Sequence, residues 1–369
     1  MRQNNSQSRL RILCVFFVFL LFDCATIKKY DRRTINIIAV GDNLIHKALI
    51  TYAENETGEF NFKPFYRGIR DVVSAADIAF INQETLIAGE AFGYSGYPQF
   101  NGPEQIGDAL IWTGFNVVNH ASNHSMDKGE AAVFAVMDYW KTKKNITTLG
   151  IHRSEEERKK PRIIISKGVK IGFLSYTYGL NGMSLPDDKP WLVSLIDKKI
   201  MAKEIDALRA KCDFLIVSMH WGKEYEHTPN ATQEELAVFL AERGVDLVIG
   251  HHPHVLQPVR WIERKNGSRM LCYFSLGNLI SAQNETPRML GGMMSVKLNK
   301  TKEGAVYIKN YALIPLVTHY ERDSSGFRVE LLENYSNLSA ERHALNRQNT
   351  PLTPEYFHTI FNSVDSFSD

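Results

Sequence analysis

Five separated motifs in this sequence carry side chains that could bind metal ions. They are Asp42, Glu84, Asn123 with its neighbour His124, His220, and the pair His252 and His254. Carboxylates, an amide oxygen and imidazoles together suit a site for two divalent ions. Such ions, about 3.5–4 Å apart, bind a hydroxide nucleophile and neutralise charge that develops on a transferring group. This mixture of ligands favours Mn, Zn, Fe or Co over Ca or Mg.

Each motif follows a short apolar run. The run Leu247-Val248-Ile249 ends at Gly250, and His252 and His254 flank a proline soon afterwards. Short β-branched runs bounded by Gly and Pro are typical of buried strands in a parallel sheet. Open α/β sheets bind their ligands beyond the carboxyl ends of such strands. The proline stiffens the turn, so both imidazoles can point toward one ion.

Each motif alone also has a simpler interpretation. Asp42 could cap a helix, Glu84 could be a solvated acid, and Asn123 could be a turn residue. His220 could be a hydrogen-bonded core histidine, and the last motif could be a His-rich surface loop. The shared position after five strands favours a joint site over five coincidences.

The elements that position these motifs alternate along the chain. Strands are expected over 34–40, 77–81, 115–118, 214–219 and 246–249, and helices over 65–76, 127–141, 194–210 and 232–243. Between and after them, hairpins are expected around Lys167-Gly168 and Asn266-Gly267, with more antiparallel strand over 293–298 and 305–314. The sequence therefore predicts one α/β domain over 34–320, with two mixed β-sheets flanked by helices. Residues 335–369 are polar and weakly patterned, which predicts a peripheral tail.

The amino terminus carries a targeting signal. Arg9 and Arg11 precede an apolar run over 12–22, which is short for a transmembrane helix and suits a signal peptide. The run ends in Leu21-Phe22-Asp23-Cys24, which resembles a bacterial lipobox, although Asp23 departs from the usual small residue. We expect residues 1–24 to form a lipoprotein-type anchor through Cys24. An ordinary signal peptide and an uncleaved anchor are the alternatives.

Composition excludes several functions. The formal net charge of the 369-residue chain is +2, so bulk charge gives no reason to expect a nucleic-acid partner. The four cysteines show neither a disulfide framework nor a CxxC pair, so a metal must use nitrogen and oxygen ligands. Walker loops, GxSxG elbows and Gly-rich dinucleotide turns are absent from the sequence.

Several motifs, in this order, resemble the CapA family of poly-γ-glutamate capsule synthesis proteins. They are Gly41-Asp42, Asn82-x-Glu84-Thr85, Asn123-His124-x-x-Asp127, Thr177-Tyr178-Gly179, His220-Trp221-Gly222-x-Glu224-Tyr225, Gly250-x-His252-Pro253-His254 and Ser275-Leu276-Gly277-Asn278. The resemblance spans about residues 34–315. It implies a fold related to calcineurin-like metallophosphoesterases and a role in capsule biosynthesis.

The resemblance also implies roles for the site residues. Asp42 and His254 would hold one ion, and Asn123, His220 and His252 the other, with Glu84 bridging them. His124 would act on the leaving group as the catalytic residue. The usual DxH histidine is missing, because Asn43-Leu44 follow Asp42, so the first ion lacks a ligand unless His46 supplies it.

Trp221, Glu224 and Tyr225 are expected to shape a substrate pocket, with core packing as the alternative for Trp221. Lys223, Arg260 and Arg288 are candidates for receiving an anionic substrate. Two functions remain open. One is an exported, metal-dependent hydrolase or transferase acting on an anionic polymer or its precursor. The other is a non-catalytic lipoprotein that binds polymer or a membrane synthase subunit.

Overall fold

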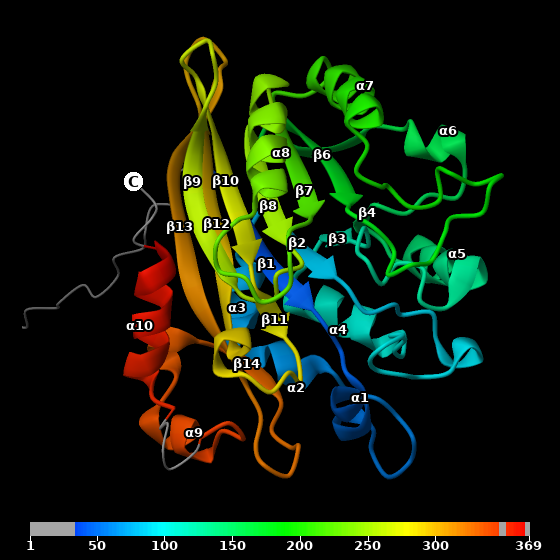
Figure 1. Ribbon diagram of the computed structural model, residues 1–369, viewed down its shortest axis with the longest axis vertical. Coiled ribbons are helices and arrows are strands. Elements are labelled where there is room, and N and C mark those ends of the chain that lie inside the picture. Colours follow the sequence, from blue (N-terminus) through cyan, green and yellow to red (C-terminus); the bar gives the residue numbers. More distant parts are fainter. Residues whose placement is uncertain (1–33, 347–351, 366–369) are drawn as a thin grey trace, which may run out of the picture. The chain divides into compact units, whose positions relative to one another are not determined.

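The computed structural model describes residues 34–346 and 352–365. The predicted anchor over 1–24 lies outside the described residues. In the described part, the strands form two mixed sheets flanked by helices, which confirms the expected fold class (Figure 1). None of the helices in this part is long and apolar enough to cross a membrane.

The first sheet joins a parallel half to an antiparallel half. Its strands, in spatial order, are β14 (Arg328–Leu331), β13 (Val306–His319), β12 (Leu290–Lys300), β1 (Ile35–Asn43), β2 (Ile78–Gln83), β3 (Val117–Asn119) and β4 (Thr147–Leu149). The strands β1 to β4 are parallel to one another, and β12 to β14 continue the sheet antiparallel. A short strand, β11 (Asn278–Ile280), pairs in parallel with the end of β1.

The second sheet has a parallel centre with an antiparallel pair at each edge. Its order is β5 (Arg162–Ser166), β6 (Val169–Thr177), β7 (Phe214–His220), β8 (Leu247–His251), β10 (Arg269–Leu276) and β9 (Leu256–Glu263). The pairs β5–β6 and β9–β10 are the two hairpins that the turn residues predicted. The register aligns His220 with His251, so two candidate motifs leave neighbouring strands at the same level.

Alternate side chains of both sheets meet in a buried core. Ile37 of β1, Phe80 of β2, Phe173 of β6 and Ile249 of β8 all belong to this cluster. The opposite faces are also apolar and pack under helices, so the central strands are buried on both sides. This explains why these strands are continuous apolar runs in the sequence.

Helices cover the outer faces of both sheets. They are α1 (Lys47–Ala53), α2 (Lys63–Tyr66), α3 (Arg70–Ser74), α4 (Gln105–Thr113), α5 (Gly129–Lys141), α6 (Glu155–Arg158), α7 (Lys198–Arg209), α8 (Ala231–Glu242), α9 (Asn337–Arg342) and α10 (Pro354–Asp365). Side chains cap the amino termini of α7 and α8. Asp197 caps α7, and Asn230 forms a capping box with Gln233 in α8.

The helix predicted over 65–76 is broken into α2, a 3₁₀ turn over Arg67–Ile69, and α3. Gly68 lies in that turn. A Cβ placed on it would lie 2.4 Å from the carbonyl oxygen of Val329 in β14. The close backbone approach to a distant strand is a tertiary constraint that helical periodicity does not contain.

The segment after Tyr335 differs from the expected peripheral tail. Its described residues contain α9 and α10, and the side chains of Leu352, Phe357 and Phe361 are buried in the outer core of the first sheet. Figure 1 shows α10 beside β9 and β13. Phe357, Ile360, Phe361 and Val364 recur at helical spacing in α10, so the sequence contains a signal for this helix, whereas the surface that buries it forms only in the folded protein.

Candidate metal centre

The five predicted motifs lie at one edge, where the parallel strands of both sheets end. Asp42 lies at the end of β1, and Glu84 follows β2 directly. Asn123 lies in the loop after β3, His220 ends β7, and His252 follows β8. The strand-end arrangement that the sequence predicted is therefore present, with one contribution from each of these five strands.

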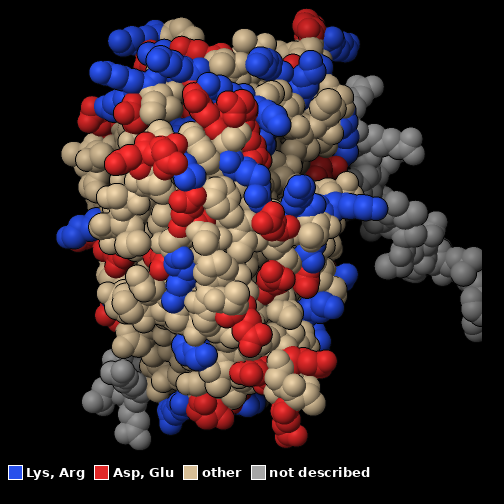
Figure 2. All heavy atoms as spheres, turned by 90° about the vertical axis from the view of Figure 1, so that its right-hand side faces the viewer, with Lys and Arg blue, Asp and Glu red and all other residues tan. Residues whose placement is uncertain are grey.

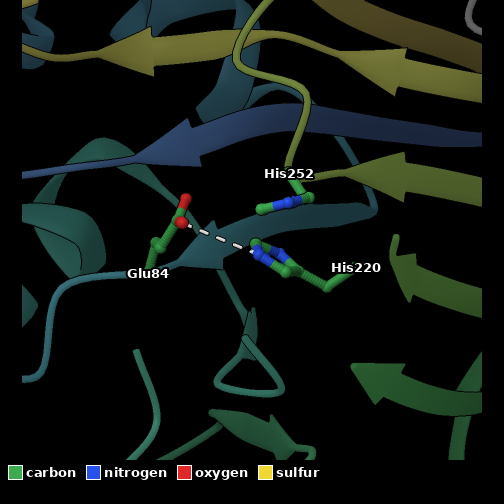
Figure 3. A group of neighbouring side chains, drawn as sticks. All are labelled: Glu84, His220 and His252. Carbon is green, nitrogen blue, oxygen red and sulfur yellow. Dashed lines mark ion pairs between the residues drawn. The ribbon is translucent and has the colours of Figure 1, made fainter. Parts of the chain in front are cut away.

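A first group joins the two sheets through Glu84, His220 and His252. One potential ligand atom from each residue lies within 4.8 Å of the others, and all three side chains are buried. Figure 3 shows the Glu84 carboxylate facing both imidazoles. The Nε2 atom of His220 is 3.6 Å from Oε1 of Glu84 and 2.7 Å from Oδ1 of Asn123, so the Asn123 amide oxygen joins this group.

A second group comprises Asp42, Glu84 and His254, again with ligand atoms within 4.8 Å of one another. The Nδ1 atom of His254 lies 3.0 Å from Oδ2 of Asp42, and its Nε2 lies 3.8 Å from Oε1 of Glu84. Glu84 thus belongs to both groups and lies between them. This is the grouping expected for two ions, and the division of ligands between them stays a prediction.

The environment of the Glu84 carboxylate indicates whether a metal ion fits at this site. Its residue is 1% exposed, yet neither Oε1 nor Oε2 has a hydrogen-bond partner among the described residues. A buried polar atom without a partner costs about 1–3 kcal/mol, so such atoms call for an explanation. A divalent cation between the two groups would satisfy both oxygens, and the surrounding imidazoles and carboxylates are suitable donors. The residues present therefore fit the metal.

The protonation states of two of the three histidine ligands agree with this interpretation, whereas Glu84 and Asp42 outweigh burial and raise the pKa of His254 to about 9, so metal binding there would release a proton. Burial lowers the pKa of His252 to about 3 and holds that of His220 well below its usual value, so both rings are neutral, as metal ligands must be. Burial, with Asp42, Glu224 and Asp127 nearby, raises the pKa of Glu84 well above its usual value. This repulsion between carboxylates is what a bound cation would relieve.

A third group was not expected. Its members are Glu224, His252 and His254, whose ligand atoms also lie within 4.8 Å of one another. The sequence predicted Glu224 as a substrate contact, whereas its carboxylate lies beside two predicted metal ligands. His46, the expected substitute for the missing DxH histidine, belongs to none of the three groups found among the described residues. Its Nδ1 instead lies 3.1 Å from the Leu44 carbonyl oxygen.

The turn that carries the two histidines is strained. His252 has φ = +95° and His254 has φ = +59°, in the left-handed region that residues with a Cβ rarely adopt. Each such residue costs about 1–3 kcal/mol and persists only where the surroundings fix it. Here the strained turn directs both rings into the site, with centroids 5.9 Å apart. The proline in the sequence suggested a rigid turn but not its hand.

Glycine permits the close approach of strands beneath the site. A Cβ on Gly41 would lie 1.9 Å from the carbonyl oxygen of Gly277. The neighbouring amide of Asp42 donates a hydrogen bond to the same oxygen at 2.9 Å. Gly41 therefore allows β1 to reach the loop before β11, which fixes the position of Asp42.

Three asparagines support the ligands, and reasoning from the residues alone did not identify them. Asn82 donates to Oδ1 of Asp42 at 2.8 Å, and Asn119 donates to Oδ1 of Asn82 at 2.7 Å. Oδ1 of Asn278 lies 3.1 Å from Nδ1 of His254. Such partners orient ligands and fix imidazole tautomers. Their signal in the sequence was their place at strand ends beside the motifs.

His124 lies beside the ligands and has its own partner. Its Nδ1 donates to Oδ2 of Asp127 at 2.7 Å, and its ring packs edge-on against Phe100 with centroids 4.7 Å apart. The ring is 5% exposed. The arrangement leaves Nε2 as the atom available for proton transfer, in the manner of an imidazole oriented by a carboxylate.

The predicted substrate residues divide into three kinds. Trp221 is 1% exposed, stacks on Phe274, and donates from Nε1 to the Phe274 carbonyl oxygen at 2.9 Å. It belongs to the outer core of the second sheet, so the packing alternative describes it and a pocket role does not. Glu224 joins the third metal-type group, as described above. Tyr225 is 40% exposed and lies beside His254, with ring centroids 6.1 Å apart.

Among the three candidate cations, Arg288 is the one beside the centre. Its guanidinium lies 3.5 Å above the ring of Tyr225, and its Nε has no partner among the described residues. Arg260 instead stacks on Phe274 and pairs with Glu234, and Lys223 pairs with Glu226. Tyr178, which was noted only as part of a family motif, is half exposed and packs against His252 with ring centroids 4.6 Å apart.

One known protein family matches this chain over the part that contains the site. Residues 36–283 match the family described as bacterial capsule synthesis protein PGA_cap. This match covers well over half of the 369 residues and contains all five motifs. The chain belongs to the PGA_cap family. The expected family membership is thereby confirmed.

Two curated relatives of this PGA_cap chain carry capsule names. "PGA biosynthesis protein CapA" of Bacillus subtilis (strain 168) is 32% identical over 193 residues, covering 52% of this chain and 49% of that protein. "Capsule biosynthesis protein CapA" of Bacillus anthracis is 29% identical over 187 residues, covering 50% and 44%. The match thus spans about half the length of these relatives.

Solved structures similar to this PGA_cap chain include nucleotidases. The 5'-nucleotidase precursor from Thermus thermophilus has a TM-score of 0.45 at 12% identity, covering 90% of this chain and 58% of that one. The NAD nucleotidase of Haemophilus influenzae has a TM-score of 0.47 at 13% identity, covering 90% and 56%. Scores at this level support no statement about activity.

Proposed function

We propose that this chain is a metal-dependent hydrolase or transferase of capsule biosynthesis, acting on an anionic polymer such as poly-γ-glutamate or on its precursor. The observation that carries the proposal is the buried carboxylate of Glu84, which has no hydrogen-bond partner among the described residues and which two groups of metal-type ligands share. A purely structural site would leave two oxygens unsatisfied for no benefit. Membership of a capsule synthesis family supports the class of substrate.

The centre would hold two divalent ions, and Mn, Zn, Fe and Co suit its ligands. Asp42 and His254 would hold one ion, Asn123, His220 and His252 the other, and Glu84 both. Ions held there would supply Lewis acidity and lower the pKa of a bound water. The remaining chemistry falls to the side chains around the centre.

His124 would donate a proton to the leaving group. The hydrogen bond from Nδ1 to Asp127, at 2.7 Å, fixes the ring orientation and the tautomer. Nε2 can then donate a proton to the departing oxygen or nitrogen. A general acid positioned in this way typically accelerates a reaction by about 10²–10⁴-fold.

Arg288 would receive the negative charge of the substrate. Its side chain is 15% exposed, rests on Tyr225, and pairs with Glu285 at 2.9 Å, while Nε remains without a partner among the described residues. Guanidinium groups bind carboxylates and phosphates with two parallel hydrogen bonds. Tyr225 would position this guanidinium beside the metal centre.

Export and anchoring are a further part of the proposal. We expect Cys24 to be acylated, which would hold the domain at the cell envelope near the membrane subunits of a polymer synthase. Full-length protein should then incorporate labelled fatty acid, and Cys24→Ala should abolish the label. Export of an unlabelled wild-type protein would exclude lipid anchoring.

The test of function uses the full chain loaded in turn with Mn, Zn, Fe and Co. Turnover is measured on a panel of phosphoesters and γ-glutamyl peptides. Metal-dependent turnover that is lost in Asp42→Ala would support the proposal. The absence of the DxH histidine, and the exclusion of His46 from the ligand groups found in the described residues, favour the accessory lipoprotein as the second candidate. A folded protein that binds no metal and turns over none of these substrates would contradict the enzymatic proposal and support the second function.

A further inference from the structure

A cavity lies away from the metal centre. It has a volume of about 710 Å³ and opens between α6, α7 and the strands β4 and β6. This volume is within the range of ordinary small-molecule sites, about 300–1,000 Å³. None of the predicted metal ligands lines it. Phe173, Trp191 and Leu208 are among its apolar lining residues.

Three buried polar atoms at this cavity lack partners among the described residues. They are Nη2 of Arg158, Oγ of Ser175 and Nδ1 of His152. The side chain of Arg158 is 9% exposed, and Ser175 and His152 are 4% and 7% exposed. All three residues line the same cavity, and burial, with Arg158 and Arg162 nearby, lowers the pKa of His152 to about 3.

Arg158 is held in place while one of its nitrogens stays free. Its Nε donates to Oε1 of Glu204 at 2.7 Å, and the other oxygen of Glu204 accepts from Tyr176 at 2.7 Å. Both oxygens of Glu204 are therefore occupied. The guanidinium is oriented in advance and its Nη2 has no hydrogen-bond partner among the described residues; guanidinium groups prefer carboxylates and phosphates.

The charge around the cavity is positive. Its acids are paired: Glu204 with Arg158, Glu155 with Lys159, and Asp188 with Lys189. Three lining lysines, Lys160, Lys203 and Lys211, have no ion-pair partner in the described part of the chain. Figure 2 shows Lys and Arg gathered, among some acids, on the upper part of the face that carries α6 and α7 in Figure 1.

We propose that this cavity is a binding site for a small organic anion, with an apolar body against Phe173, Trp191 and Leu208 and a carboxylate or phosphate group on Arg158. Ser175 and His152 supply further polar contacts, and the lysines attract the anion to the entrance. The site is separate from the metal centre, so it does not depend on the proposed hydrolase function.

The test is equilibrium dialysis of the full chain with 2-naphthoate, with 2-naphthylphosphonate, and with the neutral 2-naphthylmethanol. A chelator is present throughout, so that metal-bound anion contributes nothing. We expect saturable binding of at least one anion at one site per chain, and at least tenfold weaker binding of the alcohol. The preferred anion identifies the head group.

Variants on α7 locate the binding. Lys203 lines the cavity and is exposed, so Lys203→Glu changes the charge at the entrance by two units and should weaken anion binding roughly tenfold. Ala207→Trp should fill the cavity from its exposed side and abolish binding. Lys199→Glu is the matched control, because Lys199 is exposed on the same helix but does not line the cavity.

The proposal is overturned if neither anion binds saturably, since the cavity then holds only water. It is overturned equally if the alcohol binds as well as the anions. Unchanged anion affinity in both Lys203→Glu and Ala207→Trp would also exclude this cavity. Circular dichroism of each variant confirms that the fold is retained.

Discussion

Replacing Glu84 with methionine should stabilise the metal-free protein and abolish its response to metal. Methionine has a similar volume and length to glutamate but no charged or strongly polar atoms. In the metal-free protein the Glu84 carboxylate is 1% exposed and has no hydrogen-bond partner among the described residues. The nearest nitrogen atoms with which it is paired are 3.6 Å away on His220 and 3.8 Å away on His254.

The magnitude follows from those distances. Neither contact is a hydrogen bond, so the ion pairs with the two imidazoles only partly offset the cost of burying the carboxylate, about 1–3 kcal/mol for unsatisfied polar atoms. Glu84→Met should raise the free energy of unfolding by about this amount when a chelator is present. In the wild type, metal at about 100 times its dissociation constant should add about 2.7 kcal/mol, because it binds only the folded state. The variant should lack that increment.

The assay is urea unfolding of the full chain, followed by circular dichroism, with chelator and with Mn²⁺. Glu303→Met is the control, because Glu303 is exposed in the turn between β12 and β13 and should change neither curve. If Glu84→Met is less stable than wild type in chelator, the carboxylate is satisfied in the metal-free fold. If Mn²⁺ still stabilises the variant as it does the wild type, Glu84 is not a shared ligand. Either result would refute the reasoning.

Three further predictions concern single residues around the centre. His124→Ala should keep its metal and lose about 10²–10⁴-fold in kcat, with the smallest loss for activated esters, whereas Asn123→Ala should also lose metal. Metal content measured on the kinetic samples decides this, and joint loss in His124→Ala would make His124 a ligand. Glu224→Gln should lower the metal affinity about 10–100-fold, and Glu224→Asp should lower it less. Titration of metal into the metal-free protein measures this. If both variants bind metal as tightly as the wild type, Glu224 contacts only the substrate. Gly41→Ala should lower the free energy of unfolding in urea by about 1–3 kcal/mol or more, because its Cβ would lie 1.9 Å from the Gly277 oxygen. An unchanged unfolding midpoint would show that the backbone at Gly277 can move aside to accommodate the methyl group.

The sequence predicted the fold well where local signals are strong. Apolar β-branched runs marked the central strands, and Lys167-Gly168 and Asn266-Gly267 marked two hairpins that the structure contains. The prediction failed where contacts between residues far apart in the sequence determine the local structure. Gly68 breaks a helix because β14 approaches it, and α10 is buried on a surface that only the folded sheets create.

The candidate site, like the fold, was predictable only in part. Strand ends located the residues that the structure brings together, because parallel strands share one edge. Side-chain direction was not predictable: Trp221 and Glu224 lie three residues apart, yet one packs in the core and the other reaches the histidines. The positive φ angles of His252 and His254 depend on the packing of the whole edge, so no local pattern reveals them.

The most direct test of the two-metal centre is metal analysis of the purified full chain by mass spectrometry. Wild-type protein should contain about two divalent ions per chain, as a dinuclear site requires. His252→Ala and Asp42→Ala should each contain fewer, with helix and strand content by circular dichroism unchanged. A folded wild-type protein without metal, or a metal content that neither substitution alters, would contradict the account.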